Sequence, residues 1–298
     1  MRAQQVSRTA LKVSRILLFV ADDPRRAPLL PPRSAETTEA LLRATGLLKD
    51  WHLRAYRSPR FKALLSWSER TLAPGVTTHV ALRKRVIEDE TEAALEDGAT
   101  QVLVVGAGFD TLALRLGRLH RLVRFVELDH PATQSLKRHA LDDLDPPANL
   151  VLHPADLSET SLADVLDEVG WNRHARSVVI AEGLLMVLEQ GDVADFLRGV
   201  ASVVAPGSRL LGTYRLPEHE HPQPGRLGGL SRASLKAMSE PLRWSTTPEA
   251  LAALLEEAGF RMHDEPGRID LNLRYLVPAG LDIPLNRLER IMIAERGP

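Results

Sequence analysis

Glycines and an acidic residue follow two apolar runs in the middle of this 298-residue chain. Gly106 and Gly108 come directly after the run 101–105, where glycine permits a tight turn and a close approach of the backbone to a ligand. Asp129 ends the next run, at about the separation expected for an acid that accepts hydrogen bonds from ribose hydroxyls. The spacing predicts a nucleoside-type ligand. Thr111 stands where a dinucleotide fingerprint has its third glycine, which argues against a nicotinamide cofactor.

Two further apolar runs end in residues that suit the same ligand. Asp156 and Leu157 follow the run 150–153, where a carboxylate can accept a hydrogen bond from an adenine amino group and the next N–H can donate to a ring nitrogen. Glu182 directly follows the run 177–181. A charge at the end of a buried strand is costly unless it is solvated or paired. We therefore expect Glu182 to face the cleft.

Some of these residues have alternative interpretations. A Gly-x-Gly turn after a strand also occurs where the backbone only packs closely. Asp129 could be the N-cap of the helix that Pro131 begins. Glu127 is a second candidate for the ribose contact, because it lies on the face of its strand opposite to Leu128.

Short apolar runs alternate with helical stretches from about residue 100 onward. This alternation predicts an α/β fold with a doubly wound, largely parallel sheet. Two final strands, near 262–269 and 273–277, would bring the sheet to seven strands. The other predicted strands are 101–105, 123–128, 150–153, 177–181 and 209–213, and the predicted helices between them are 111–117, 131–141, 162–169 and 191–204.

The segments outside this alternation predict two additions to the core. Residues 1–97 are expected to form a helical N-terminal cap, with clear helices over 36–48 and 78–95, and to make one structural unit with the core, 98–298. The stretch 215–246 is rich in Pro and Gly and predicts a lid insertion after the fifth strand, with a short helix at 234–238. Thr246 or Thr247 would then cap a helix that begins at Pro248.

Taken together, the motifs of the chain resemble the leucine carboxyl methyltransferase family. More narrowly, they are similar to its bacterial branch of polyketide-type O-methyltransferases, which Ser7-Arg8-Thr9-Ala10 also fits. The resemblance spans about residues 7–278 and is most specific over 101–137. The motifs that carry it are Leu82-Arg83-Lys84-Arg85, Gly106-Ala107-Gly108-Phe109-Asp110-Thr111, Val126-Glu127-Leu128-Asp129-His130-Pro131, Asp156-Leu157 and Ala181-Glu182-Gly183.

The resemblance implies a class I methyltransferase fold, with a Rossmann-like seven-stranded sheet, that binds S-adenosyl-L-methionine. Arg83 would contact the methionine carboxylate, and the choice of Arg83 over Arg85 depends on the resemblance alone. Val187 is a departure, because family members commonly carry Tyr at this position. The implied cofactor-binding residues are Arg83, Gly106, Gly108, Asp129, Asp156, Leu157 and Glu182.

The activity that follows from the resemblance is O-methylation of a small-molecule carboxylate or hydroxyl. A carboxylate is already ionised at pH 7, whereas a phenol with a pKa near 10 benefits from a general base. No base stands out in the sequence. His130 and His153 are expected to be structural, and Tyr214 either faces the substrate or packs in the core. The pair His219 and His221 lacks a third ligand nearby, so no metal site is predicted.

Two alternative functions remain open. The family's namesake activity suggests a protein carboxyl methyltransferase. Val187 in place of Tyr is the best support for a protein that binds S-adenosylmethionine without catalysing transfer.

Composition and charge exclude several classes of protein. The net charge of −1 argues against a nucleic-acid partner. Cys is absent, which rules out a disulfide scaffold and a cysteine nucleophile and fits a cytoplasmic protein. The N-terminal apolar run 16–21 is too short for a membrane span. The sequence leaves the acceptor and the oligomeric state open.

Overall fold

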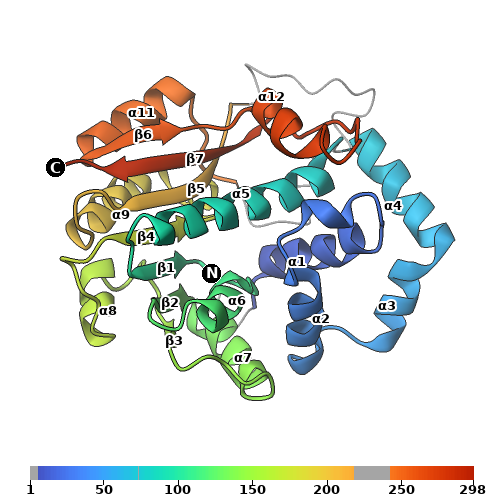
Figure 1. Ribbon diagram of the computed structural model, residues 1–298, viewed down its shortest axis with the longest axis horizontal. Coiled ribbons are helices and arrows are strands. Elements are labelled where there is room, and N and C mark those ends of the chain that lie inside the picture. Colours follow the sequence, from blue (N-terminus) through green and yellow to red (C-terminus); the bar gives the residue numbers. More distant parts are fainter. Residues whose placement is uncertain (1–5, 73, 218–241) are drawn as a thin grey trace.

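The fold is built on one central sheet, shown in Figure 1 in a computed structural model that describes residues 6–72, 74–217 and 242–298. The strand order is β3-β2-β1-β4-β5-β7-β6. The first five strands are parallel, and β7 lies antiparallel between β5 and β6. The expected seven-stranded α/β sheet is therefore confirmed. The strands are β1 (Gln101–Val105), β2 (Arg124–Asp129), β3 (Leu150–Pro154), β4 (Ser177–Ala181), β5 (Arg209–Arg215), β6 (Phe260–Asp264) and β7 (Glu289–Arg296).

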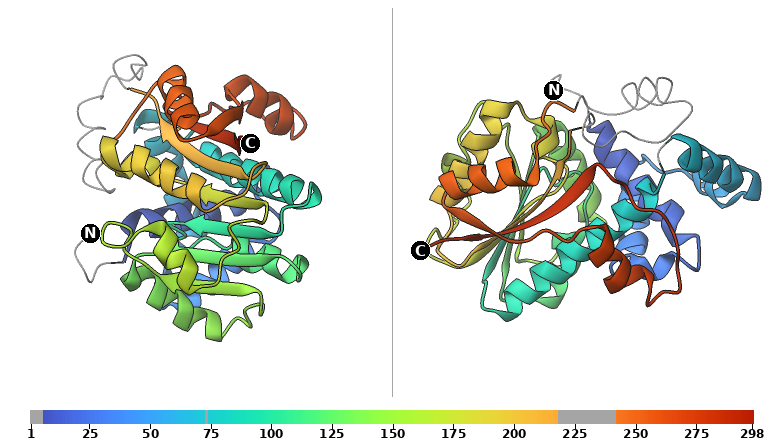
Figure 2. Two further views of the ribbon diagram at one scale, coloured as in Figure 1. Left: turned by 90° about the vertical axis from the view of Figure 1, so that its left-hand side faces the viewer. Right: turned by 90° about the horizontal axis from the view of Figure 1, so that it is seen from above.

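Helices cover both faces of this sheet (Figure 2). Successive residues of a strand point to opposite faces, so Val102 and Val104 of β1 join one apolar core while Leu103 and Val105 join the other. All four are buried, as expected for a strand between two helical layers. The helices that contribute to the first core include α1 (Arg8–Ala21), α5 (Val76–Glu96) and α6 (Leu112–Leu119); the second core includes α8 (Leu162–Glu168), α9 (Gln190–Ser202) and α11 (Pro248–Glu257).

The N-terminal region is helical, as the sequence predicts. Helix α1 ends at Ala21, and the apolar run of residues 17–20 is buried rather than exposed. This helix packs against α5 and α2. Among the described residues, no helix is long and apolar enough to cross a membrane. The remaining N-terminal helices are η1 (Ala27–Leu29), α2 (Ser34–Ala44), α3 (Asp50–Arg57) and α4 (Pro59–Leu72).

The C-terminal region corrects one prediction. Residues 273–277 do not form a strand: they belong to a helical segment made of α12 (Arg268–Leu271) and the π-helical η3 (Asn272–Leu276). Leu271 and Leu276 are buried while Leu273 and Val277 are exposed, which is helical rather than alternating burial. The strand that completes the sheet is β7. Its four central apolar residues are flanked on both sides by charged residues, which hid the strand signal.

Other boundaries agree more closely with the sequence predictions. Thr247 rather than Thr246 caps α11, because its hydroxyl accepts a hydrogen bond from the N–H of Ala250 at 3.3 Å. β6 covers only the first part of the predicted strand 262–269. The helix predicted at 234–238, and most of the insertion 215–246, lie outside the described residues. Two more elements frame the site, α7 (Pro131–Asp142) and η2 (Leu185–Val187).

Candidate active site

The two glycines after β1 have different structural roles. Both have positive φ, +71° at Gly106 and +51° at Gly108, so both need glycine's conformational freedom. Gly108 is pressed against α1, because an added Cβ would lie 2.6 Å from the Cβ of Ala10. Gly106 is exposed, and an added Cβ would only reach Leu184 at 3.5 Å. Gly106 therefore leaves backbone accessible at the carboxyl end of β1, whereas Gly108 lets α1 cover the turn.

Asp129 connects the end of β2 to this turn. Its Oδ2 accepts a hydrogen bond from the N–H of Gly108 at 2.5 Å. Asp129 is not the cap of α7, because His130 occupies that position and its Nδ1 accepts from the N–H of Ala132. The N-cap interpretation of Asp129 is therefore wrong, and the carboxylate stays at the carboxyl edge of the sheet.

Glu127 is buried between β2 and α7. Its Oε2 lies 2.6 Å from Nζ of Lys137 on α7, and both side chains are fully buried. Burial raises the pKa of Glu127, against the opposing effect of Lys137. Lys137 also donates to the carbonyl of Asp110. Glu127 thus fixes α7 to the sheet, and its prediction as a second ribose contact is wrong.

Asp156 lies next to Asp129 at the carboxyl edge, because the N–H of Ala155 donates to the carbonyl of Asp129 at 2.9 Å. Its Oδ1 accepts from the N–H and the hydroxyl of Ser158, at 3.0 and 2.6 Å, and these donors lower the pKa of the carboxyl. Leu157 is half-buried against the second core. An ionised acceptor and an apolar side chain therefore stand side by side after β3.

Arg83 and Glu182 belong to a buried cluster of charges. Arg83 donates to Glu182 at 2.7 Å and also pairs with Glu289, the first residue of β7. Lys84 lies 2.9 Å from the other carboxylate oxygen of Glu182 and pairs with Asp110 as well. Burial alone would lower the pKa of Arg83, but Glu289 and Glu182 raise it above its usual value. Lys84 holds the pKa of Asp110 well below its ordinary range despite burial.

The cluster includes residues that the sequence prediction did not select. Lys84 and Asp110 are parts of the quoted motifs, but nothing in the sequence pairs them. Glu289 lies in the strand that the prediction missed. Arg85 pairs instead with Asp89 of the same helix at 2.8 Å, with both side chains partly exposed. Arg83, and not Arg85, therefore pairs with a residue at the end of a strand, while its contact with the cofactor stays a prediction.

His79 is the other residue that the prediction missed. It lies four positions before Arg83 on α5 and is only 2% exposed. Neither ring nitrogen has a hydrogen-bond partner in the described part of the chain. Burial lowers the pKa of His79, and Glu289 partly opposes this effect. The only sequence signal was its spacing from Arg83, since residues four apart share a helix face.

The remaining candidates for a base have structural partners. Tyr214 is fully buried and donates to Glu265 at 2.6 Å, so the packing interpretation is correct. His153 lies 3.3 Å from Glu168. His219 and His221 lie outside the described residues, and the described residues include no group of three potential metal ligands. Val187 ends η2 and is half-buried.

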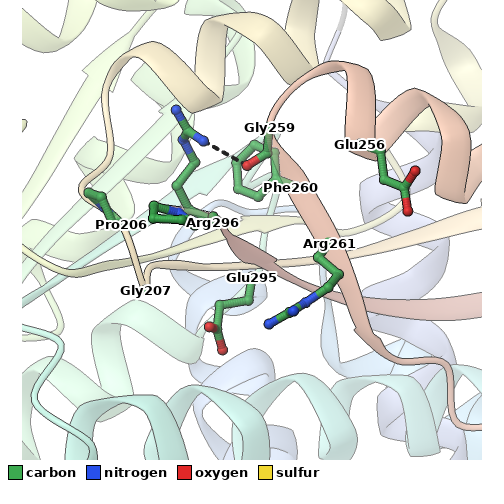
Figure 3. A pocket seen from close by; sticks show the side chains of 10 residues that line it. Pro206, Gly207, Glu256, Gly259, Phe260, Arg261, Glu295 and Arg296 are labelled. Atoms are coloured by element: carbon green, nitrogen blue, oxygen red, sulfur yellow. Dashed lines mark hydrogen bonds between the residues drawn. The ribbon is translucent and has the colours of Figure 1, made fainter.

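A surface pocket of about 640 Å³ lies near the amino end of β5, away from the carboxyl ends of the parallel strands (Figure 3). Its lining includes Gly207, just before β5, and Arg296, the last residue of β7. Arg296 donates to the carbonyl of Gly259 across it at 2.7 Å. Ligands of open α/β sheets bind at the carboxyl ends of the parallel strands. The pocket is therefore separate from the residues assembled above.

The residues at the carboxyl edge match the chemistry of S-adenosylmethionine. The nucleoside part needs acceptors and open backbone, which Asp129, Asp156 and Gly106 offer. The amino-acid part carries an ammonium and a carboxylate, which suit Glu182 and Arg83 respectively. The donor set therefore fits this cofactor.

The sheet order and this edge define a class I methyltransferase. A methyltransferase structure from Thermobifida fusca has the same fold, with a TM-score of 0.55 at 18% identity over 87% of this chain and 94% of that one. The chain belongs to the leucine carboxyl methyltransferase family, whose model matches residues 10–201. It is an S-adenosyl-L-methionine-dependent enzyme of that family.

Bacterial relatives agree with this assignment. The chain is 27% identical to YktD of Bacillus subtilis over 70% of its own length and 68% of the relative's. It is 30% identical to a Mycolicibacterium gilvum protein over 81% and 73% of the two lengths. Both relatives bear names that describe S-adenosyl-L-methionine-dependent methyltransferases.

Proposed function

We propose that this enzyme methylates an oxygen atom of a small-molecule acceptor, either a carboxylate or a hydroxyl. The observation that carries the proposal is the burial of the charged cluster. Arg83, Glu182 and Glu289 have side chains that are 8%, 6% and 12% exposed. A reacting group must enter this enclosed region, which a small molecule does more readily than a folded protein surface.

In this proposal the cofactor supplies a methyl group bound to a positively charged sulfur. Arg83 and Glu182 hold its amino-acid end, and Asp129 accepts from its ribose. Asp156 and Leu157 frame the adenine, while Gly106 and Gly108 shape the turn beneath it. Alignment of the reacting atoms and exclusion of water are the protein's main contributions, and positioning of this kind contributes roughly 7–11 kcal/mol.

The helical N-terminal region, residues 1–97, acts in this proposal as a cap on the core, 98–298. Helix α1 supports this role, because Ala10 contacts the turn at Gly108 and the N–H of Ser7 donates to Thr133 of α7 at 3.2 Å. The cap would thus close over the cofactor from the side of β1 and β2.

The test is calorimetric titration with S-adenosylmethionine and S-adenosylhomocysteine, followed by an acceptor screen with labelled cofactor. Micromolar binding, and label in a small carboxylate or phenol, are the expected results. Cofactor binding without any product from the acceptor panels would contradict the proposal and favour a non-catalytic binding protein, the role that Val187 suggests.

Protein carboxyl methylation is the second candidate, favoured by the family to which the chain belongs. It predicts label in a protein band that is lost under mild alkali, since carboxyl methyl esters hydrolyse readily. Label that stays with small molecules would exclude it.

A further inference from the structure

Helix α5 runs along the strands, from their carboxyl ends to their amino ends. In its second half, Glu90 lies 3.1 Å from Arg209, the first residue of β5. Nearer its start, Arg83 reaches Glu182, which directly follows β4. The helix therefore reaches the carboxyl edge of the sheet at Arg83. His79 lies one turn further out, about 6 Å along the helix axis.

His79 lies near the start of β7, since the carboxylate of Glu289 and the guanidinium of Arg290 both affect its pKa. Gly106 follows β1, Asp129 is the last residue of β2, Asp156 comes shortly after β3, and Glu182 follows β4. The end of β5 and the start of β7 are therefore left for the acceptor. Glu289 is the first residue of β7 and pairs in register with Arg215 at the end of β5. Its carboxylate raises the pKa of His79.

The imidazole of His79 makes no hydrogen bond in the described part of the chain. Buried polar groups in proteins nearly always have a hydrogen-bond partner. Both nitrogens of His79 lack one among the described residues, although the side chain is almost fully enclosed. A ligand hydroxyl at this position would satisfy one of them.

The surroundings of His79 suit a proton acceptor. Burial keeps the imidazole neutral by lowering its pKa, and Arg83 and Arg290 act in the same direction. Glu289 opposes them by raising the pKa of His79. Arg215 of β5 in turn lowers the pKa of Glu289, which favours the ionised carboxylate. A proton taken up by the ring would therefore be stabilised by the carboxylate of Glu289.

We propose that His79 is the general base of the methyl transfer and that the acceptor is accordingly a hydroxyl compound, a phenol in particular, rather than a carboxylate. This inference rests on the proposed function. A carboxylic acid has already lost its proton at pH 7 and has no use for a base, whereas a phenol near pKa 10 must lose one.

The acceptor oxygen attacks the methyl carbon while a ring nitrogen of His79 takes the hydroxyl proton. The O–C bond forms, and the S–C bond breaks with its electron pair remaining on sulfur. The positive charge thus moves from the sulfonium to the imidazolium, and the proton then leaves to solvent.

The experiment compares wild type, His79→Gln and His139→Gln on two acceptor series, phenols of graded pKa and substituted benzoates. His139 is an exposed histidine of α7 and is the matched control. His79→Gln is expected to slow transfer to phenols about 100-fold or more, most strongly for the least acidic ones. Benzoate rates and binding of S-adenosylhomocysteine should stay within about twofold, and His139→Gln should match wild type.

Two further readouts keep the inference falsifiable if His79→Gln fails to fold. In wild type, kcat/KM for a phenol should rise with pH through the titration of one group well below the phenol's own pKa. A nitrophenol bound beside S-adenosylhomocysteine should show nitrophenolate absorbance below the pH at which the free compound ionises, without any turnover. The opposite result in either measurement overturns the role of His79.

The remaining outcomes separate the inference from the proposed function. Equal losses on phenols and benzoates, or no loss on either, overturn the inference. Wild-type protein that methylates benzoates but not phenols overturns it and leaves the proposed function intact. Wild-type protein that binds the cofactor and methylates neither series overturns both.

Discussion

The backbone N–H of Gly108 donates to Oδ2 of Asp129 at 2.5 Å, so the carboxylate at the end of β2 is tied to the glycine turn after β1. Helix α1 packs on the same turn through Ala10. Helix α1, the turn after β1 and the end of β2 therefore meet at Gly108. Any ligand that Asp129 binds is thereby coupled to the conformation of the turn and to the position of α1.

Replacement of Asp129 tests this coupling through cofactor affinity. Asp129→Ala removes both the acceptor for Gly108 and the proposed ribose contact, and hydrogen bonds to charged groups contribute about 1.5–3 kcal/mol. Calorimetry should show S-adenosylhomocysteine binding at least about tenfold weaker. Asp129→Asn keeps an acceptor oxygen for Gly108 and should be less impaired. Wild-type affinity in Asp129→Ala would show that the ribose lies elsewhere.

Substitution of Gly108 should destabilise the fold more than substitution of a glycine in open space. Gly108→Ala combines backbone strain of about 1–2 kcal/mol with overpacking against Ala10 of about 1–3 kcal/mol. Gly46 has φ of +73° and nothing near an added Cβ, so Gly46→Ala should show the strain alone. Urea unfolding measures both changes. Adding Ala10→Gly to Gly108→Ala should recover part of the loss, and a purely additive double variant would argue against the contact.

Arg83 should be far more important for stability than its neighbour Arg85. Arg83→Gln leaves the buried Glu289 without the guanidinium that it pairs with and leaves Glu182 with Lys84 alone, which costs about 3–5 kcal/mol. Arg85→Gln breaks a pair with Asp89 whose side chains are 31% and 40% exposed, and should cost less than about 1 kcal/mol. The two costs are measured as the change in the free energy of unfolding in urea for each variant relative to wild type. Similar costs for the two variants would mean that the cluster around Arg83 is hydrated.

The sequence predicted the sheet well wherever apolar runs are continuous. β1 and β4 are buried on both faces, so their strand signal is strong and their boundaries match. Strand β7 was not predicted because its apolar centre is short and has charged residues on both sides. One of these residues, Glu289, pairs with Arg83 of a helix that is distant in the sequence. No local pattern reveals such a partner.

Contacts between segments distant in the sequence also limited the prediction of the site. Residues that follow strands, such as Asp129 and Asp156, could be predicted because parallel strands bring their carboxyl ends to one edge. Glu127 was misassigned because alternation along β2 does not tell which face carries α7, where Lys137 neutralises it. His79 has a role only through its position relative to the sheet, which helical spacing alone does not give.

Tyr214 should matter for stability and not for catalysis. Its hydroxyl donates to Glu265 at 2.6 Å in a buried position, and burial together with this carboxylate raises the pKa of the phenol. Tyr214→Phe should cost about 1–3 kcal/mol in urea unfolding and leave S-adenosylhomocysteine binding unchanged. A variant with normal stability but slower methyl transfer would instead place this hydroxyl against the acceptor.

The buried imidazole of His79 should make the protein less stable in weak acid. Because burial lowers the pKa of His79 in the folded state, the unfolded chain binds more protons once the pH falls below the ordinary histidine value of about 6.5. The stability is therefore fully present above about pH 6.5 and is lost as the pH falls from there toward the folded-state pKa. The contribution of this one group is at most about 1.4 kcal/mol per pH unit.

His79→Gln removes that linkage, so its urea unfolding free energy should decline less between pH 6.5 and 5 than that of wild type. His139→Gln is the matched control: His139 is exposed, its ring lies 2.6 Å from the carbonyl of Ser135 on the same helix, and the variant should follow the wild-type curve. Parallel curves for wild type and His79→Gln would mean that the ring takes up its proton as readily in the folded protein as in the unfolded chain. In that case Glu289 would offset the whole effect of burial on the pKa of His79, and the predicted loss of stability in weak acid would be wrong.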